Sequence, residues 1–312
     1  MKVKKNEPMR NHTTWRIGGP VDLLVQPESV EELQQALQQA RASGQPYYVI
    51  GGGSNLLVAD EGLPGTVIQL GGCLCGLQIN GTRVIAEAGV PLPLLARKAA
   101  EQNLSGLEFA AGIPGTVGGA VVMNAGAYSS QISNVIRQVV CCDKNGEMVT
   151  LDVSDCQFSY RNSRFKRNSD YTVVSVTMEL ILGEQQEILD RMQHNTSLRK
   201  EKQPVEYPSA GSIFKNPPGD AAGRLVELVG AKGWRQGGAM VSEKHSNFIV
   251  NVDSATCTDV LQLIARVKQE VREKTGIILE EEILFLGREN LESAVDSPSI
   301  LCYNKIDKNT KL

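Results

Sequence analysis

The sequence predicts an α+β protein in which two lobes with glycine-rich loops are followed by a smaller α/β domain. Its 312 residues suggest two domains at about 150 residues each and leave ample length for a buried core. A strand, a helix and a second strand precede a glycine loop within residues 21–55, whereas short strands with Gly and Asn turns follow from residue 65. Pro204 and Pro208 then interrupt the chain after a charged helical segment, which places a domain boundary near residue 200.

The first lobe is expected to contain a β-α-β unit. Residues 21–26 (VDLLVQ) and 46–50 (PYYVI) read as strands, and the second of these is apolar enough to be buried. Between them, the spacing of Ser29 and Glu32 matches a capping box at the start of an amphipathic helix. The glycine loop at residues 51–55 (GGGSN) follows the second strand directly, which is where ligands gather in such units.

The second lobe and the smaller domain are predicted from later patterns. An amphipathic helix is expected near residues 92–102, a β-rich run at 171–182 and a charged, Gln-rich helix at 184–202. Helices near 221–228 and 254–274 belong to the smaller domain. The expected divisions are residues 1–66 for the first lobe, 67–200 for the second lobe, 201–287 for the substrate-binding domain and 288–312 for a polar C-terminal tail.

Composition and charge exclude several classes of function. The formal net charge of −3, from 32 basic and 35 acidic residues without a long basic run, predicts no nucleic-acid partner. Seven Cys form an odd count without framework or metal-ligand spacing, so we expect reduced thiols, a cytoplasmic location and no metal site. No apolar segment typical of a secretory signal follows the basic start. The sequence identifies no protein partner.

The uncharged segment 109–136 is long enough to cross a bilayer, but its glycines, proline and polar residues argue against membrane insertion. Within it, residues 111–119 (AGIPGTVGG) form a second glycine-rich loop. Backbone amides that no side chain covers can converge on a diphosphate. Three glycines after a strand are also typical of an ordinary tight turn, and the Rossmann spacing GxGxxG is not met. Two such loops in one protein favour a large, flat, dinucleotide-like cofactor.

Six runs of residues carry a resemblance to a known family. They are NHTTWRIGG (11–19), GGGSNLLV (51–58), AGIPGTVGGAVVMNAGAY (111–128), YRNSRFK (160–166), YPSAGSIFKNP (207–217) and ILEEEILFLG (278–287). In their order and spacing, the chain resembles the UDP-N-acetylenolpyruvoylglucosamine reductase (MurB) family over residues 9–287. Each run alone is modestly specific, whereas six in register make coincidence implausible.

The resemblance implies an FAD-binding fold of the vanillyl-alcohol-oxidase type. It also implies that NADPH reduces a noncovalently held FAD, which passes a hydride to the enolpyruvyl group of a UDP-sugar to give UDP-N-acetylmuramate for peptidoglycan synthesis. On residues that match the family's motifs, it assigns catalysis to Arg161, Ser212 and Glu282. It assigns UDP-sugar contacts to Lys215 and Asn216. The FAD contacts that it implies are Gly51, Gly52, Gly53, Ser54, Asn55, Gly112, Ile113, Pro114, Gly115, Gly118, Gly119, Asn124 and Gly126.

The chemistry of enolpyruvyl reduction suits the three catalytic residue types. Hydride addition to C3 puts negative charge onto C2 and the carboxylate, so the site needs a cation, a partner for the enolate and a proton donor. Arg161 can bind a carboxylate bidentately, and the intermediate is basic enough to take a proton from Ser212, although a hydroxyl is a weak acid. Without the family context, Arg161 is better interpreted as an exposed cation in a basic loop, and Ser212 as a turn or helix-cap serine.

The acidic triplet Glu280–Glu282 contains the third catalytic position and departs from the family's pattern. The pattern places the carboxylate on Glu282, with Glu281 where Pro is usual and Leu284 where Arg is common. A run of acids is also typical of a solvated strand edge. Ser209 lies three residues early for the GSxFKN pattern, and we assign it no catalytic role. The short interval from Arg161 to Ser212 resembles the shorter form of the family, which lacks an inserted loop over the substrate.

Two other functions stay open on the sequence alone. A flavin oxidase or dehydrogenase of the same fold, acting on another sugar or alcohol, would keep both glycine loops. A UDP-sugar-binding relative without catalysis would fit the departures at Glu281 and Leu284. NADPH consumption that depends on the enolpyruvyl UDP-sugar excludes the first alternative, and a colourless preparation that binds UDP would support the second.

Overall fold

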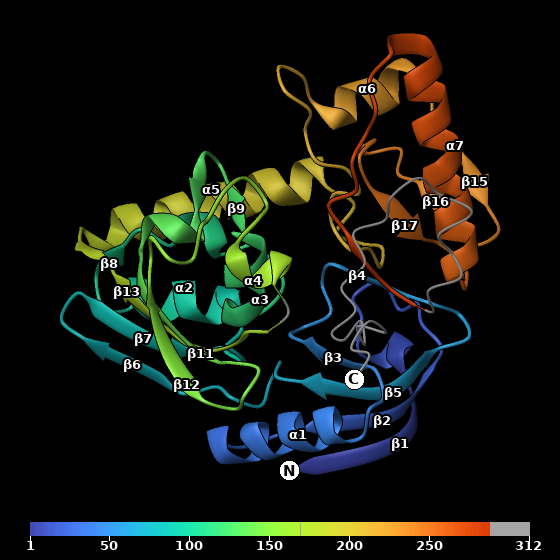
Figure 1. Cartoon of the computed structure of the whole chain (residues 1–312). Helices are drawn as coiled ribbons and strands as arrows, with labels where there is room; N and C mark the ends of the chain where they lie inside the picture. The colour runs from blue at the N-terminus through green and yellow to red at the C-terminus, as the bar shows by residue number, and fades with distance from the viewer. Residues whose placement is uncertain (169, 288–312) are drawn as a thin grey trace.

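The first lobe of the computed structural model, which describes residues 1–168 and 170–287, is built on a four-stranded sheet (Figure 1). Its strand order is β1-β2-β5-β3, with β2 and β3 both parallel to β5 and β1 antiparallel to β2. The expected β-α-β unit is confirmed, with β5 inserted between its two strands. The strands are Lys2–Pro8 (β1), Pro20–Gln26 (β2), Tyr47–Ile50 (β3) and Leu63–Gln69 (β5).

Helix α1 (Val30–Ala42) connects β2 to β3 and packs between the two lobes. Its apolar positions Leu33 and Leu37 are fully buried in a core that also contains residues of the second lobe. The helix begins with half of the predicted capping box: the Ser29 hydroxyl accepts a hydrogen bond from the Glu32 amide. The Glu32 carboxylate instead accepts one from the Glu28 amide.

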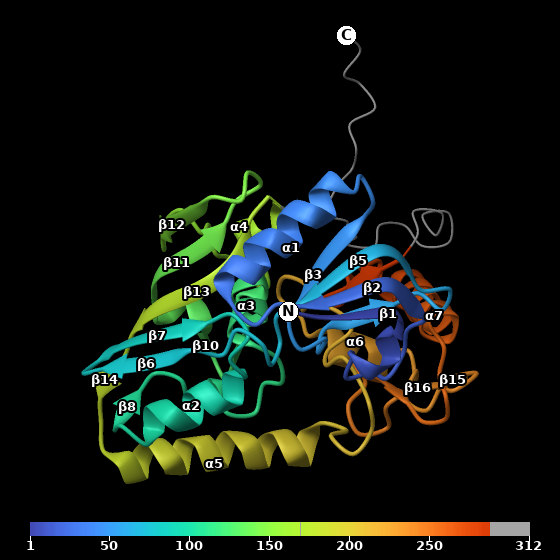
Figure 2. The ribbon, with the colours of Figure 1, turned by 90° about the horizontal axis from the view of Figure 1, so that it is seen from below.

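A five-stranded antiparallel sheet of order β12-β11-β13-β7-β6 forms the second lobe. Figure 2 shows α1 on one side of this lobe and the long helix α5 along the opposite side. The strands are Leu77–Asn80 (β6), Arg83–Glu87 (β7), Ile136–Cys142 (β11), Met148–Asp152 (β12) and Thr172–Glu179 (β13), and the helices are Leu92–Ala100 (α2), Val117–Met123 (α3) and Gln185–Lys202 (α5).

Two expected lobe boundaries need correction. A division after residue 66 cuts through β5, whose residues 66–68 pair with both β2 and β3, so β5 belongs to the first lobe. A division at residue 200 falls inside the last turn of α5, which ends at Lys202. The β-rich run 171–182 is also two strands, because β13 ends at Glu179 and Ile181–Leu182 (β14) pairs with Leu104–Ser105 (β8) instead.

The smaller domain packs two helices against a three-stranded sheet. Thr256 and Asp259 form a complete capping box at the start of its long helix, three residues later than the sequence pattern suggested. Trp15 and Ile17 join the core of this domain, although in the chain they lie between β1 and β2 of the first lobe. The elements are Ala222–Leu228 (α6), Arg235–Gln236 (β15), Ala239–Val241 (β16), Ile249–Asn251 (β17) and Cys257–Thr275 (α7). The predicted tail, residues 288–312, lies outside the described residues.

A short parallel strand pair ties the end of the described chain to the first lobe. Leu284–Leu286 (β18) pairs with Leu56–Val58 (β4) in parallel register. Because the first residues of two paired parallel strands lie at the same edge of the sheet, the segments that precede β4 and β18 lie side by side. The glycine loop at residues 51–55 precedes β4, and Glu282 lies two residues before β18. This pairing therefore brings the glycine loop and Glu282 together.

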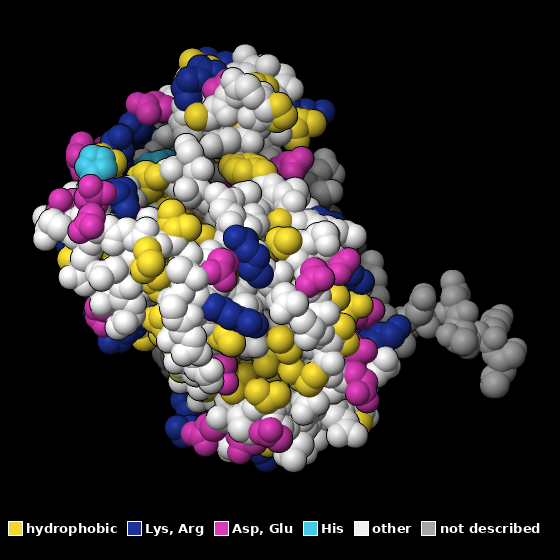
Figure 3. Space-filling view, turned by 90° about the vertical axis from the view of Figure 1, so that its left-hand side faces the viewer, with side chains coloured by type: hydrophobic (Ala, Val, Ile, Leu, Met, Phe, Trp, Pro, Cys, Tyr) yellow, Lys and Arg dark blue, Asp and Glu magenta, His cyan; other side chains and the backbone are white. Residues whose placement is uncertain are grey.

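The remaining elements are short, and the surface is mixed in charge. On the face drawn in Figure 3, basic and acidic side chains are interspersed. No helix within the described ranges is both long and apolar enough to cross a membrane. All six Cys in these ranges are free, and burial raises the pKa of Cys141 to about 12. The short elements are Met9–Asn11 (η1), Glu108–Ala110 (η2), Gly126–Ala127 (β9), Ser130–Gln131 (β10), Ile132–Asn134 (η3) and Arg164–Arg167 (α4).

Candidate active site

A cavity of about 360 Å³ lies where the two lobes and the smaller domain meet. It brings together both glycine loops and all three residues expected for catalysis, although these come from five separate segments of the chain. Such a volume is typical of a small-molecule site. The expected site residues that line the cavity are Gly51, Gly52, Gly53, Ser54, Asn55, Ile113, Pro114, Gly115, Gly118, Gly119, Gly126, Arg161, Ser212 and Glu282.

The two glycine loops pack directly against each other. The Ser54 hydroxyl donates a hydrogen bond to the Pro114 carbonyl over 3.0 Å, and a Cβ on Gly115 would lie 2.7 Å from that hydroxyl oxygen. Gly115 also has a φ of +123°, which side-chain-bearing residues rarely adopt. Within the described residues, the amides of Gly52, Gly53 and Ser54 donate no hydrogen bond. These unused donors on a cavity wall fit a diphosphate.

Four expected site residues do not line the cavity. Gly112 packs against a side chain of α5 instead, and Asn124 is fully buried with its amide donating to the Ser159 carbonyl over 3.0 Å. Lys215 pairs with Glu280 at 3.0 Å, and the Asn216 side chain accepts a hydrogen bond from the first residue of α6. The sequence motif fixes the order of these residues but not the direction in which each side chain points.

Arg161 occupies a strained turn. Ser159 and Asn162 exchange two backbone hydrogen bonds across it, of 3.0 and 3.1 Å, which leaves Arg161 at the left-handed φ of +53°. The Lys166 ammonium donates to the Arg161 carbonyl over 3.3 Å, and the Tyr160 ring lies 5.3 Å from the guanidinium carbon. Backbone strain of this kind is typical of functional sites, because the surrounding contacts must hold it in place.

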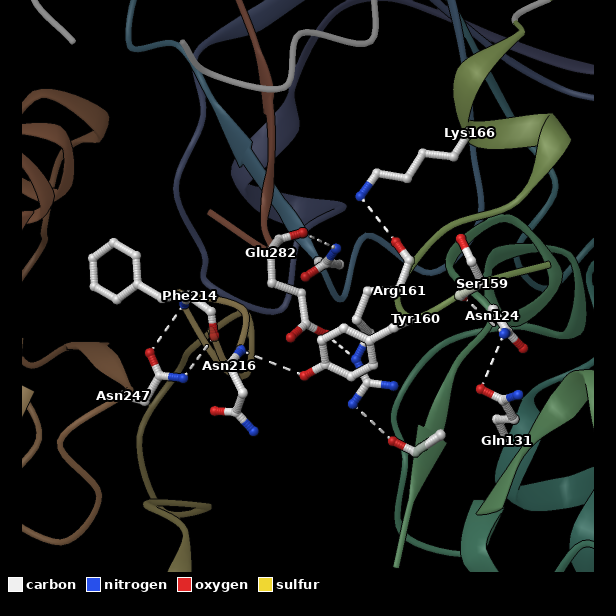
Figure 4. A network of polar contacts seen from close by, with 12 residues as sticks. Asn124, Gln131, Ser159, Tyr160, Arg161, Lys166, Phe214, Asn216, Asn247 and Glu282 are labelled. Carbon is white, nitrogen blue, oxygen red and sulfur yellow. Dashed lines mark hydrogen bonds and ion pairs between the residues drawn. The ribbon is translucent and has the colours of Figure 1, made fainter. Parts of the chain in front are cut away.

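Arg161 and Glu282 form an ion pair inside the cavity (Figure 4). Nε of Arg161 lies 2.6 Å from Oε1 of Glu282, although the N–H bond does not point along that contact. The other end of the guanidinium donates to the Gly126 carbonyl over 2.9 Å. Burial raises the pKa of Glu282, and the neighbouring Arg161 charge only partly opposes this.

Backbone hydrogen bonds join the segments that carry Ser212 and Glu282. The Glu282 amide donates to the Ile213 carbonyl over 2.7 Å, next to Ser212. From the other side, the Asn55 side chain donates to the Glu282 carbonyl over 3.1 Å, and the Leu284 amide donates to the Asn55 carbonyl over 2.9 Å. The Asn55 side chain, expected to contact the cofactor, therefore holds the backbone of Glu282.

Sequence reasoning missed two polar residues beside the site. The buried Asn247 side chain accepts from the Phe214 amide and donates to the Phe214 carbonyl, at 3.0 and 2.8 Å, and so fixes the backbone of the segment that follows Ser212. Burial and the nearby Lys215 charge lower the pKa of Lys166 to about 8. Lys166 is part of the YRNSRFK run, so a motif residue five positions after Arg161 was the available signal.

Interpretation of the acidic triplet as a solvated strand edge is wrong for Glu281. This residue is 9% exposed, and its carboxylate accepts a hydrogen bond from the Lys268 ammonium over 2.8 Å. Glu280 is exposed and pairs with Lys215. The three carboxylates thus have three different environments. No group of His, Cys, Asp and Glu in the described ranges could hold a metal ion.

The fold and the cavity define a two-lobe flavoprotein with a separate C-terminal domain. A family model described as FAD binding domain matches residues 21–152, and one described as UDP-N-acetylenolpyruvoylglucosamine reductase, C-terminal domain, matches residues 203–286. The chain belongs to the UDP-N-acetylenolpyruvoylglucosamine reductase family. The predicted α+β fold of the vanillyl-alcohol-oxidase type, with FAD as cofactor, is confirmed.

Relatives of known name match nearly the whole chain. It is 49% identical over 287 residues, 92% of its length and 94% of the other, to the UDP-N-acetylenolpyruvoylglucosamine reductase of Moorella thermoacetica. Identity to the same enzyme of Clostridium tetani is 45% over 290 residues, 93% of this chain and 94% of the other. The crystal structure of UDP-N-acetylenolpyruvylglucosamine reductase (MurB) from Thermus caldophilus is similar with a TM-score of 0.79 and 40% identity, over 91% of this chain and 99% of that one.

Proposed function

We propose that this protein reduces the enolpyruvyl group of UDP-N-acetylglucosamine enolpyruvate with NADPH, using noncovalent FAD, and so makes UDP-N-acetylmuramate for peptidoglycan synthesis. The observation that carries the proposal is the convergence of Arg161, Glu282 and Ser212 on a cavity whose other wall is formed by two glycine loops. The bound FAD would supply hydride transfer between NADPH and the substrate. Reduced thiols and a cytosolic nucleotide-sugar substrate favour a cytoplasmic location.

The cavity suits a noncovalently bound FAD. The unused amides of Gly52, Gly53 and Ser54 would hold its diphosphate. None of the described residues that line the cavity is His or Cys, the side chains through which flavins are often attached. A Cβ on Gly51 would collide with the Thr116 hydroxyl, so a backbone without side chains is needed where the loops meet.

Arg161 would bind the substrate carboxylate. Its planar guanidinium can form two parallel hydrogen bonds to a carboxylate. The ion pair with Glu282 and the hydrogen bond to Gly126 hold the guanidinium in the cavity before substrate arrives. A preorganised cation stabilises the negative charge that develops as the double bond accepts a hydride.

Ser212 and Glu282 would complete the reaction at C2 of the enolpyruvyl group, the carbon that must receive a proton. No hydrogen bond engages the Ser212 hydroxyl within the described residues, so it is available to give its proton to C2. The raised pKa of Glu282 means that its carboxyl takes up a proton more readily than an exposed one, and once protonated it can donate a hydrogen bond to an enolate oxygen. The Asn216 backbone amide donates to the hydroxyl of Tyr160, the residue before Arg161, and we retain Lys215 and Asn216 as contacts for the UDP-sugar.

A visible spectrum and one assay test the proposal. The purified protein should be yellow, and acid precipitation should release the flavin into the supernatant. NADPH oxidation under anaerobic conditions should require the enolpyruvyl UDP-sugar. If the protein oxidised other sugars or alcohols but did not reduce the enolpyruvyl UDP-sugar, it would be a different oxidoreductase of this fold. A colourless protein that binds UDP would indicate a relative without catalysis.

A further inference from the structure

Lys166 is a charged side chain beside the site that the proposed reaction does not use. It belongs to α4, and its ammonium donates a hydrogen bond to the Arg161 carbonyl over 3.3 Å. Figure 4 shows that the ammonium approaches this carbonyl, whereas the guanidinium of Arg161 extends toward Glu282. Lys166 does not line the cavity, so it cannot touch a substrate there, but it holds a residue that would.

The backbone of Lys166 is firmly anchored. The Ser163 hydroxyl accepts a hydrogen bond from the Lys166 amide over 3.3 Å and donates one to the Val122 carbonyl over 2.7 Å. Ser163 and Phe165 are both fully buried, and Val122 belongs to α3 and lines the cavity. The ammonium therefore reaches Arg161 from a base that is attached to the cavity wall.

The Arg161 carbonyl depends on this ammonium. Among the described residues, the only hydrogen bond that this carbonyl accepts comes from Lys166. Arg161 has a φ of +53°, so the turn that carries it must be held by its surroundings. The backbone hydrogen bonds between Ser159 and Asn162 close the turn, and Lys166 holds its carbonyl side.

The Lys166 ammonium has no carboxylate of its own. Two carboxylates lie close enough to favour its charge, but one of them, Glu282, pairs with Arg161. The other, Glu280, pairs with Lys215. No ion pair engages Lys166 in the part of the chain that the structure describes, and burial together with the nearby Lys215 charge lowers its pKa. A partly buried ammonium in this setting costs stability, so a contribution to folding does not explain it.

We propose that Lys166 is a positioning residue for the substrate carboxylate. Its ammonium holds the Arg161 carbonyl and thereby keeps the strained turn in the conformation that directs the guanidinium into the cavity. This inference rests on the proposed function, in which Arg161 binds that carboxylate. A charged donor forms a stronger hydrogen bond to a carbonyl than a neutral one does, which gives an ammonium at this position a purpose despite its cost.

Binding of two nucleotide sugars separates positioning from folding. UDP-N-acetylmuramate carries the carboxylate, whereas UDP-N-acetylglucosamine lacks it. In the FAD-loaded Lys166→Met variant, we expect the Kd for UDP-N-acetylmuramate to rise about tenfold, because the guanidinium is no longer directed at the carboxylate. The Kd for UDP-N-acetylglucosamine should stay within about twofold. The melting temperature should not fall, because methionine replaces the apolar stem of the lysine without a charge to bury.

Two matched variants complete the comparison. Lys166→Arg keeps a charged donor, so the Kd for UDP-N-acetylmuramate should stay within about threefold of the unmodified value. Arg167→Gln is the control, because Arg167 follows Lys166 in α4 but is exposed and donates to the carbonyl and side chain of Gln157 instead. It should leave both Kd values unchanged.

A double-mutant cycle tests whether Lys166 acts through Arg161. In the Arg161→Met background, Lys166→Met should change the Kd for UDP-N-acetylmuramate by less than about twofold, because the guanidinium that Lys166 positions is gone. The same loss of about tenfold in both backgrounds would overturn the inference, since Lys166 would then act on the ligand without Arg161.

Two further outcomes would also overturn it. Weaker binding of both nucleotide sugars, with a lower melting temperature, would show that Lys166 stabilises the fold. Unchanged Kd values in Lys166→Met would show that the Arg161 turn is held without the ammonium. Failure of the unmodified protein to reduce the enolpyruvyl UDP-sugar would instead refute the proposed function, so the two failures are distinguishable.

Discussion

Nε of Arg161 lies 2.6 Å from Oε1 of Glu282, although one residue sits in a turn of the second lobe and the other at the end of the smaller domain. The contact joins two of the three proposed catalytic residues across the cavity. Since each side chain is less than a quarter exposed, removal of either charge leaves its partner partly buried and unpaired. In the proposed reaction, the pair would couple binding of the substrate carboxylate to the protonation state of Glu282.

Replacement of Glu282 tests this coupling. Glu282→Gln should lower kcat by about 10²–10⁴-fold, because the amide cannot exchange a proton or balance the Arg161 charge. FAD content should remain that of the unmodified protein. Glu280→Gln is the control, since Glu280 is exposed and should cost less than twofold in kcat. Equal losses in the two variants would place the catalytic carboxylate elsewhere in the triplet.

Glu281 should matter for stability rather than for catalysis. Its buried carboxylate accepts a hydrogen bond from Lys268. Glu281→Gln keeps the shape but loses the charge, so we expect the free energy of unfolding to fall by about 1–3 kcal/mol while kcat stays within threefold. Thermal unfolding and steady-state kinetics measure the two effects separately. A large loss of kcat at full stability would contradict this assignment.

Asn55 should act on Glu282 more than on the cofactor. Its side chain donates to the Glu282 carbonyl, so Asn55→Ala should lower kcat by about 10–100-fold through misplacement of the carboxylate. The Kd for FAD should change less than threefold. Ser54→Ala is the comparison, because the Ser54 hydroxyl bridges the two glycine loops and its loss should weaken FAD binding instead. A weakened FAD complex in Asn55→Ala would restore its expected cofactor role.

Local patterns in the sequence predicted most helices and strands, because caps and apolar spacing act within a few residues. The capping residue Ser29 and the buried stripe of α1 are examples. The sheet to which β5 belongs could not be read in this way. Its segment reads as a strand, but its partners β2 and β3 are set by packing between distant segments, which moved the lobe boundary.

The site residues also differ in whether local sequence patterns could predict their roles. Motifs identified residues that line the cavity, including Arg161, Ser212 and Glu282. They did not show that Asn55 points toward Glu282, because the two are brought together only by the parallel pairing of β4 and β18. Arg199, which also lines the cavity, was not singled out because its distinguishing feature, a partly buried charge with no counter-ion among the described residues, exists only in the folded chain.

The pH profile should report on Lys166. Its pKa is lowered to about 8, mainly by burial, so it loses its charge as pH rises through that value. The substrate is anionic, and kcat/KM should therefore fall above about pH 8. Lys166→Arg should extend the plateau to higher pH, because a guanidinium stays charged. An unchanged basic limb in this variant would assign the limb to another group.

The lowered pKa of Lys166 should also affect protein stability, which should increase with pH where kcat/KM falls. The folded pKa of Lys166 lies below its unfolded value of 10.5, so the unfolded chain binds more protons between about pH 8 and 10.5. The contribution of Lys166 to the free energy of unfolding therefore increases with pH across this window. Lys166→Met should be more stable than the unmodified protein at pH 7, and the difference should shrink as pH approaches 10.

Ser212 should be needed for only one half of the reaction. In the proposed reaction, NADPH reduces bound FAD before the enolpyruvyl substrate binds, so a hydroxyl that protonates C2 would have no role in that first half. In Ser212→Ala, anaerobic stopped-flow should show flavin bleaching at nearly the normal rate. Reoxidation by the enolpyruvyl UDP-sugar should slow by about 10²–10⁴-fold, the usual cost of losing a general acid.

Ser209→Ala provides the control for the hydroxyl itself. Ser209 shares the Tyr207–Pro217 run with Ser212, but its carbonyl, not its hydroxyl, is the group held in place, through a hydrogen bond from Thr14 of 2.7 Å. Loss of its hydroxyl should therefore leave both half-reactions unchanged. If Ser212→Ala instead slowed bleaching and kept normal reoxidation, Ser212 would position NADPH, and the proton for C2 would have to come from another group in the cavity. Glu282, raised in pKa and joined through its amide to Ile213, would then be that group.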